Sequence, residues 1–132
     1  MFVNRLNENE KIAFATLLDA LIHSDDELTI EEETIRVALY KEMNLDYLPD
    51  QSKFSLESAC SAFLSHSSKV AALFELIGVG LVDSEYSAEE SELVSRIGLE
   101  FGFNELDITH MENLVITIIN SVDEAQAFME EN

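Results

Sequence analysis

The chain has 132 residues, with 27 acidic and 7 basic side chains, so its formal net charge is −20. A surface this negative repels nucleic-acid phosphates and anionic lipids, so we expect no nucleic-acid partner. It favours cations and basic protein surfaces instead. No apolar run approaches the ~20 residues that a membrane span requires, and we therefore expect no direct membrane insertion.

Hydrophobic residues make up 47% of the chain, which is enough for the core of one domain. Cys60 is the only cysteine, which excludes an internal disulfide and a cysteine-based zinc site. We expect Cys60 to be a packed core thiol. The N-terminal stretch MFVNRLNENEK becomes polar too early for a secretory signal peptide. These features predict a cytoplasmic protein.

Apolar residues recur at helical spacing along almost the whole chain, which contains only 4 Gly and 1 Pro. No segment alternates with the period of two that is typical of strands. The sequence therefore predicts an all-α fold, a compact single-domain bundle of about six or seven helices. No stretch resembles a linker, so residues 1–132 are expected to form one domain.

The first three helices are expected from capping and loop signals. Asn7 and Glu10 form a capping box, which predicts a helix from residue 8 to about residue 23. A second helix should follow Thr29 and end near Met43, with Ile35, Ala38, Leu39 and Met43 on one face. The stretch NLDYLPDQS is expected to be a loop, because proline removes a backbone donor. A short third helix is expected over residues 56–64.

The second half of the chain predicts further helices. The stretch KVAALFELIGVGLV is apolar on nearly every side, so a helix over residues 70–82 should be the central one. Its two glycines, Gly78 and Gly80, suggest that another helix crosses closely. A fifth helix should follow Ser87 and end near residue 101, and a sixth should begin near residues 105–107. Ser121 with Glu124 resembles one more capping box, which predicts a short terminal helix.

An internal repeat relates two parts of the chain at an offset of 58 residues. DDELTIEEE begins at residue 25, and DSEYSAEES begins at residue 83. The match continues to two residues that tolerate the left-handed conformation, Asn44 and Gly102. Each unit is a helix, an acidic turn and a second helix, over about residues 8–45 and 68–103. We expect the two units to pack face to face and to bring their acidic turns together.

The acidic stretches allow two interpretations. Thr29 and Ser87, each followed three residues later by a glutamate, fit a capping box without any ligand. Carboxylates that precede the cap are left unexplained, and clustered carboxylates suit Ca²⁺ or Mg²⁺. If the turns approach each other, one ion could be shared by six side chains, Asp25, Glu27, Glu32, Asp83, Glu85 and Glu90. The stretch is not an EF-hand loop, because its sixth position is not glycine.

The repeated pattern helix–Asp–x–Glu–x–(Ser/Thr)–x–Glu–Glu–helix resembles the TerB-like tellurite-resistance domain. The resemblance covers about residues 6–114 and rests on these short motifs. It implies a compact helical domain of bacterial, cytoplasmic stress-response modules that is not an enzyme. It also implies action through protein partners, some of them membrane-associated, and divalent-metal binding at the acidic turns.

Transferred to this chain, the resemblance assigns the metal to the same six carboxylates. The family usually has glycine directly after the aspartate, whereas this chain has Asp26 and Ser84. Because aspartate tolerates the left-handed region better than serine does, the turns are expected to differ in shape from those of the family.

The three histidines, His23, His66 and His110, do not cluster in the sequence, and no catalytic or nucleotide-binding motif is present. We therefore expect no enzymatic activity, and we expect His23 to cap the end of the first helix. Two alternatives to an interaction module stay open. One is a dedicated Ca²⁺- or Mg²⁺-binding protein, and the other is an acidic mimic of DNA that blocks a basic protein surface.

Overall fold

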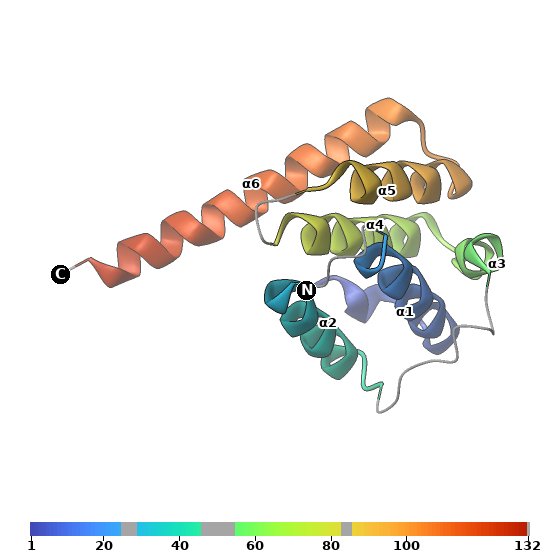
Figure 1. Ribbon diagram of the computed structural model, residues 1–132, viewed down its shortest axis with the longest axis horizontal. Coiled ribbons are helices and arrows are strands. Elements are labelled where there is room, and N and C mark those ends of the chain that lie inside the picture. The colour runs from blue at the N-terminus through green and yellow to red at the C-terminus, as the bar shows by residue number, and fades with distance from the viewer. Residues whose placement is uncertain (25–28, 46–54, 83–85, 132) are drawn as a thin grey trace.

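A computed structural model describes residues 1–24, 29–45, 55–82 and 86–131. Within these ranges the chain is helical and contains no strand, which confirms the all-α prediction (Figure 1). The elements are the 3₁₀ helix η1 (Val3–Arg5) and six α-helices, α1 (Glu8–Ile22), α2 (Ile30–Glu42), α3 (Leu56–Ser61), α4 (His66–Leu81), α5 (Ala88–Glu100) and α6 (Glu105–Glu130). No helix in the described ranges is both long enough and apolar enough to cross a membrane.

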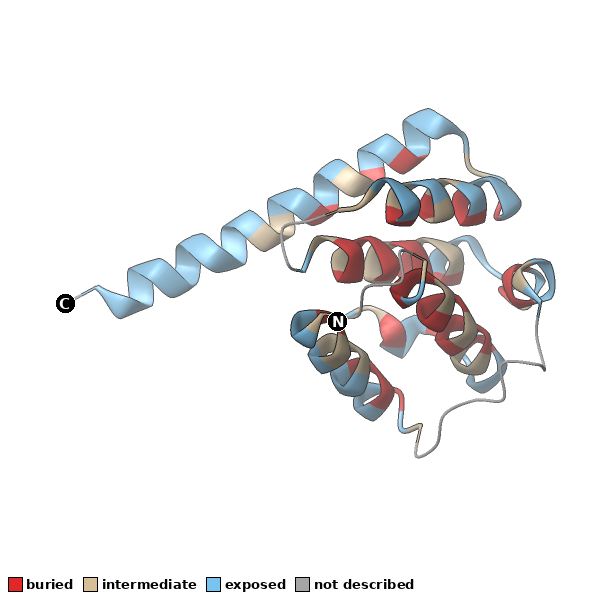
Figure 2. Ribbon diagram, in the orientation of Figure 1, coloured by how far each residue is buried: buried red, intermediate tan, exposed pale blue. Residues whose placement is uncertain are grey.

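Helix α4 lies at the centre of the bundle, as its apolar sequence predicts. It contacts α1, α2, α5, α6 and η1, and its buried side chains include Leu73, Leu76 and Ile77. Each unit of the repeat also packs its first helix against the second helix of the other unit, since α1 contacts α5 and α2 contacts α4. Figure 2 shows burial concentrated along α1 and α4. Cys60 is buried as expected, and burial raises the pKa of its thiol to about 11.

Each α-helix in the described ranges begins with a capping box, which explains where these helices start. Three of the four boxes expected from the sequence, at Asn7, Thr29 and Ser87, form at the starts of helices. Three further boxes, at Ser55, Ser65 and Asn104, use Ser or Asp as the third residue in place of Glu. Helix α4 consequently starts at His66, four residues before its expected beginning, and α3 ends at Ser61, before the expected residue 64.

The two units of the repeat end in the same way. Asn44 and Gly102 are the two described residues with clearly positive φ, at 58° and 96°. The following amides close equivalent loops, in which Leu45 N donates to the Tyr40 carbonyl and Phe103 N to the Gly98 carbonyl, both at 2.9 Å. This Schellman geometry confirms the predicted helix stops.

Two expectations about the helices are wrong. Helix α6 runs unbroken through Ser121 to Glu130, so the predicted terminal helix does not exist separately. No glycine or proline interrupts the helical pattern there, and an S-x-x-E stretch continues a helix when nothing ends it. In α2, Ala38 is exposed, and Tyr40 is buried in its place.

The two glycines of α4 differ in their surroundings. A Cβ at Gly80 would lie 2.7 Å from Tyr86 Cε1, so the residues before α5 approach α4 closely there. A Cβ at Gly78 would meet nothing within 4 Å. The close neighbour of Gly80 is therefore a tyrosine side chain and not the crossing helix that the sequence suggested, while Gly78 faces open space.

Candidate functional site

The structure describes two of the six predicted cation ligands. Glu32 and Glu90 occupy the third position of α2 and α5, directly after the acidic turns. The other four predicted ligands, Asp25, Glu27, Asp83 and Glu85, lie outside the described residues. The candidate site is therefore built from the two helix starts, which we call the acidic corners (residues 29–33 and 87–91).

The two acidic corners have equivalent local geometry. Thr29 N donates to Glu32 Oε1 at 3.1 Å, and Ser87 N donates to Glu90 Oε1 at 3.0 Å. In return, the hydroxyl oxygen of each cap accepts the backbone N–H of the glutamate, at 3.0 Å in both corners. Each glutamate is therefore held by one of its oxygens, and the backbone fixes the position of its side chain.

The structure brings these two glutamates together in the interior. The exposed fractions of Glu32 and Glu90 are only 3% and 2%, and Glu32 lies close enough to Glu90 to raise its pKa. Two ionised carboxylates both accept hydrogen bonds, so they can bond to each other only when one of them holds a proton. Burial first, and then the contact with Glu32, raise the pKa of Glu90 to about 7 against the opposing bond from Ser87.

Two buried side-chain oxygens near this pair, Glu90 Oε2 and the Tyr86 hydroxyl, make no hydrogen bond of good geometry in the described part of the chain, although the Glu32 and Glu112 carboxylates lie near them. Burial, with the negative charge of Glu112, raises the pKa of Tyr86 above its usual range, so this phenol stays neutral. An unpaired buried polar atom is costly, which makes this small region one that a ligand would stabilise.

Glu10 provides an internal comparison, because it is also a buried glutamate at the third position of a helix. Its Oε1 accepts the Asn7 N–H at 2.9 Å, and its Oε2 accepts the Leu64 N–H at 2.9 Å. Burial alone would raise the pKa of Glu10, but these backbone bonds and one with Ser68 hold it below the usual value. Burial is the main cause of the raised pKa of Glu90 and the facing Glu32 carboxylate adds to it, whereas at Glu10 the hydrogen bonds outweigh burial.

A hard divalent cation fits the donor set of the corners. Ca²⁺ and Mg²⁺ bind carboxylate oxygens, and either would neutralise the repulsion between Glu32 and Glu90. Glu90 Oε2 is free to accept such a bond, since only Oε1 is used by the helix cap. Among the described residues no group of three His, Cys, Asp or Glu forms a metal cluster. A complete site would therefore need ligands from the acidic turns that precede the helices.

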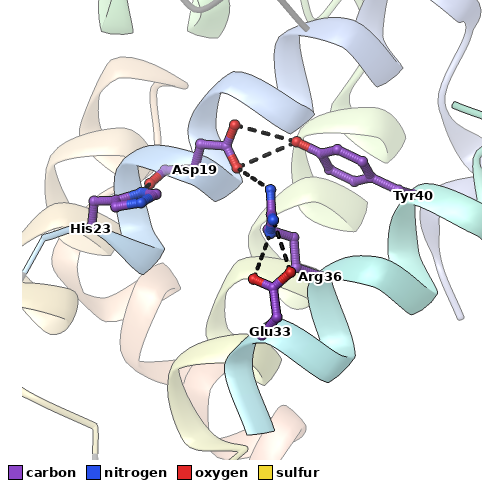
Figure 3. Close-up of polar contacts among 5 residues, drawn as sticks. All are labelled: Asp19, His23, Glu33, Arg36 and Tyr40. Atoms are coloured by element: carbon purple, nitrogen blue, oxygen red, sulfur yellow. Dashed lines mark hydrogen bonds and ion pairs between the residues drawn. The ribbon is translucent and has the colours of Figure 1, made fainter. Parts of the chain in front are cut away.

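A second polar cluster joins α1 to α2 and is not evident in the sequence (Figure 3). The Tyr40 hydroxyl lies 3.3 Å from both carboxylate oxygens of the buried Asp19, and Arg36 Nη1 lies 3.6 Å from Asp19 Oδ1. Arg36 also binds Glu33 through two nitrogens, at 2.9 and 3.1 Å. His23 caps α1 as expected, with its Nδ1 2.7 Å from the Asp19 carbonyl oxygen. Two carboxylates thus share one guanidinium, and the contacts of Asp19 with Arg36 and Tyr40 join α1 to α2.

His66 and His110, which are far apart in the sequence, line one cavity of about 290 Å³ between α4 and α6. The rest of its lining is mainly apolar and includes Phe103, whose ring meets the His66 ring edge-on at 5.7 Å. Only the folded chain reveals this proximity, because the two histidines lie on different helices.

The chain was compared with protein families, curated proteins and solved structures. No family profile, curated protein or solved structure matches the chain.

Proposed function

We propose that this protein is a non-enzymatic interaction module of the TerB-like stress-response type, whose paired acidic corners bind one Ca²⁺ or Mg²⁺ ion. Glu32 and Glu90 would supply the inner carboxylates, and Asp25, Glu27, Asp83 and Glu85 would supply the outer ones. The observation that carries the proposal is the buried Glu90 Oε2, which makes no hydrogen bond of good geometry and lies near the carboxylate of Glu32.

The electrostatics of the pair support a cation. Two buried carboxylates in contact repel each other strongly at neutral pH, unless a proton or a metal ion lies between them. Glu10 shows that this chain can satisfy both oxygens of a buried glutamate with backbone donors, yet Glu90 lacks a second donor. A bound ion would replace the missing donor and join the start of α2 to the start of α5.

The interaction role rests on the resemblance of the repeated acidic turns and on the net charge of −20. A bound ion would fix the two units of the repeat relative to each other. It would thus define the surface that a partner meets, while the remaining negative charge favours a partner with a basic surface. The same charge argues for action through proteins without direct contact with nucleic acid.

Calorimetric titration with CaCl₂ and with MgCl₂ tests the cation site. The expected result is saturable binding of one ion, together with a melting temperature that rises with ion concentration by mass action. Glu90→Gln keeps the oxygen that accepts the Ser87 N–H but removes one anionic ligand, so binding should be lost. The matched control is Glu89→Gln, which removes the same charge from an exposed neighbour and should bind as the wild type does.

Sodium chloride at equal ionic strength separates a specific site from screening of the net charge. The same rise in melting temperature with sodium chloride would contradict the site, as would undiminished ion binding by Glu90→Gln. Asp25→Asn combined with Asp83→Asn should weaken binding as well, because these residues are assigned to the outer part of the site.

A further inference from the structure

Helix α6 leaves the body of the bundle and continues as an unsupported rod, which we call the α6 arm (residues 120–130; Figure 1). Ile108, Met111 and Val115 are buried against the bundle, whereas every residue of the arm is exposed (Figure 2). A solitary helix as short as the arm is marginally stable in water, so contact with another molecule would stabilise it.

The apolar stripe of α6 does not end where the bundle ends. Val122 and Met129 follow the partly buried Ile119 by three and ten residues, a spacing that places all three side chains on one face of a helix. Met129 is 78% exposed, and Val122 is exposed as well. The arm therefore carries forward, into solvent, the face that the bundle buries.

This stripe starts at an apolar groove on the bundle, with a volume of about 360 Å³. The groove is lined by residues of three helices and one that follows a helix: Ile35 from α2, Gly78 and Val79 from α4, Val82 directly after α4, and Ile119 and Asp123 from α6. The missing side chain of Gly78 leaves part of this space open. The groove and the exposed stripe share Ile119, so they form one continuous apolar surface.

The charge that α6 contributes beside this surface has a single sign. No Lys or Arg follows Arg96, whereas eight acidic residues do, namely Glu100, Glu105, Asp107, Glu112, Asp123, Glu124, Glu130 and Glu131. Asp123 and Glu130 flank the stripe on the arm. A second copy of the chain also has a net charge of −20 and would be repelled from this surface, whereas a basic partner would be attracted to it.

We infer that the groove and the α6 arm together form a docking surface for a basic amphipathic helix of a partner protein. The apolar face of that helix would lie along Val122 and Met129 and enter the groove at Gly78, and its Lys or Arg side chains would meet Asp123 and Glu130. The inference deepens the proposed interaction function by naming the surface and the chemistry of its partner, and it does not depend on a bound cation.

A designed peptide tests the surface directly. The probe is a helix of about 18 residues, roughly five turns, with leucines on one face and lysines on the other. A scrambled peptide of the same composition has equal charge but no apolar face. Fluorescence anisotropy at about 0.15 M NaCl, where exposed charges are screened beyond ~8 Å, should show saturable binding of the designed helix and much weaker binding of the scrambled one.

Site variants locate the binding. Val122→Lys with Met129→Lys should weaken the affinity at least ~10-fold, because it removes apolar contact area and adds positive charge. Leu64→Lys with Leu106→Lys adds the same charge at two exposed leucines away from the surface, and should change the affinity less than ~2-fold. Gly78→Leu fills the groove from a position with open space and should also weaken binding, while circular dichroism confirms its helical fold.

Three results would overturn the inference. The first is equal binding of the scrambled and the designed peptide, and the second is equal peptide affinity of the two double-lysine variants. The third is a dimer in sedimentation that Val122→Lys with Met129→Lys dissociates, because the surface would then be occupied by a second copy of the chain. Glu90→Gln separates this inference from the cation site, since it should bind the peptide normally. If Glu90→Gln loses cation binding but still binds the peptide, the docking surface works independently of the cation site.

Discussion

Glu32 and Glu90 face each other in the interior although 58 residues separate them in the chain, and each is fixed by the capping box of its own helix. The internal repeat accounts for this meeting, because the two glutamates occupy the same position in the two units. Local capping rules place each carboxylate, and the packing of one unit on the other places them together.

The first prediction concerns the pH dependence of stability. The raised pKa of Glu90 means that the folded protein holds a proton between about pH 4.5 and 7 that the unfolded chain has released. The free energy of unfolding therefore loses a contribution of up to about 3 kcal/mol as the pH rises through this range. Glu90→Gln should match the wild type near pH 5 and be the more stable protein near pH 8, as measured by urea unfolding.

Glu89→Gln is the control for that prediction, because its exposed carboxylate lacks the buried contact. Its stability relative to the wild type should be nearly independent of pH. A constant difference between Glu90→Gln and the wild type from pH 5 to pH 8 would show that Glu90 titrates normally.

The second prediction concerns Glu10, which joins the start of α1 to the segment before α4. Glu10→Ala leaves the partly buried Leu64 N–H without its acceptor and removes half of a capping box, so it should lower the free energy of unfolding by ~1–3 kcal/mol. Glu8→Ala, in the same helical turn, should cost less than ~0.5 kcal/mol, because the Glu8 side chain is exposed. Equal losses in chemical denaturation would show that the link to Leu64 contributes nothing.

A third prediction contrasts the two glycines of α4. Gly78→Ala should stabilise the protein by ~0.5–1 kcal/mol, because alanine favours the helix and its methyl group meets open space. Gly80→Ala should instead destabilise it by ~1–3 kcal/mol, since its methyl group would overlap the Tyr86 ring. Thermal unfolding of the two variants measures the difference, and a gain in both would contradict the close approach of Tyr86 to α4.

A fourth prediction tests the matched helix ends of the repeat. Asn44→Gly should be neutral or stabilising, because glycine adopts the positive φ of 58° without steric cost. Gly102→Ala should cost about 1 kcal/mol, since an alanine Cβ disfavours φ near 96°. The melting temperature of Asn44→Gly should therefore equal or exceed that of the wild type, and that of Gly102→Ala should be lower. Equal small decreases in both variants would argue against the left-handed caps.

How far the sequence predicts the fold depends on whether a signal is local. The caps at Asn7, Thr29 and Ser87 and the stops at Asn44 and Gly102 depend on a few neighbouring residues, so their patterns predict them correctly. The boxes at Ser55 and Ser65 are missed because serine replaces the usual third-position glutamate. At Ser121 the S-x-x-E pattern of a capping box is present, but no residue before it ends the helix, so α6 continues past it.

The candidate site depends more on tertiary contacts. The repeat predicts that the acidic corners approach each other, and the structure places Glu32 beside Glu90. Their deep burial and the orphaned Glu90 oxygen depend on how α4, α5 and Tyr86 pack, which no short motif encodes. The Asp19–Arg36–Tyr40 cluster likewise joins side chains from two helices and has no pattern in the sequence. The roles of Asp25, Glu27, Asp83 and Glu85 stay predictions, since they lie outside the described residues.

The most direct test of the paired corners is the titration of the Glu90 carboxyl carbon by NMR in the absence of divalent ions. The chemical shift should change with a midpoint near pH 7 in the wild type. In Glu32→Gln the midpoint should fall, because a neutral amide that can donate a hydrogen bond replaces the facing carboxylate. A wild-type midpoint near 4.5, or one that Glu32→Gln leaves unchanged, would contradict the meeting of the two acidic corners.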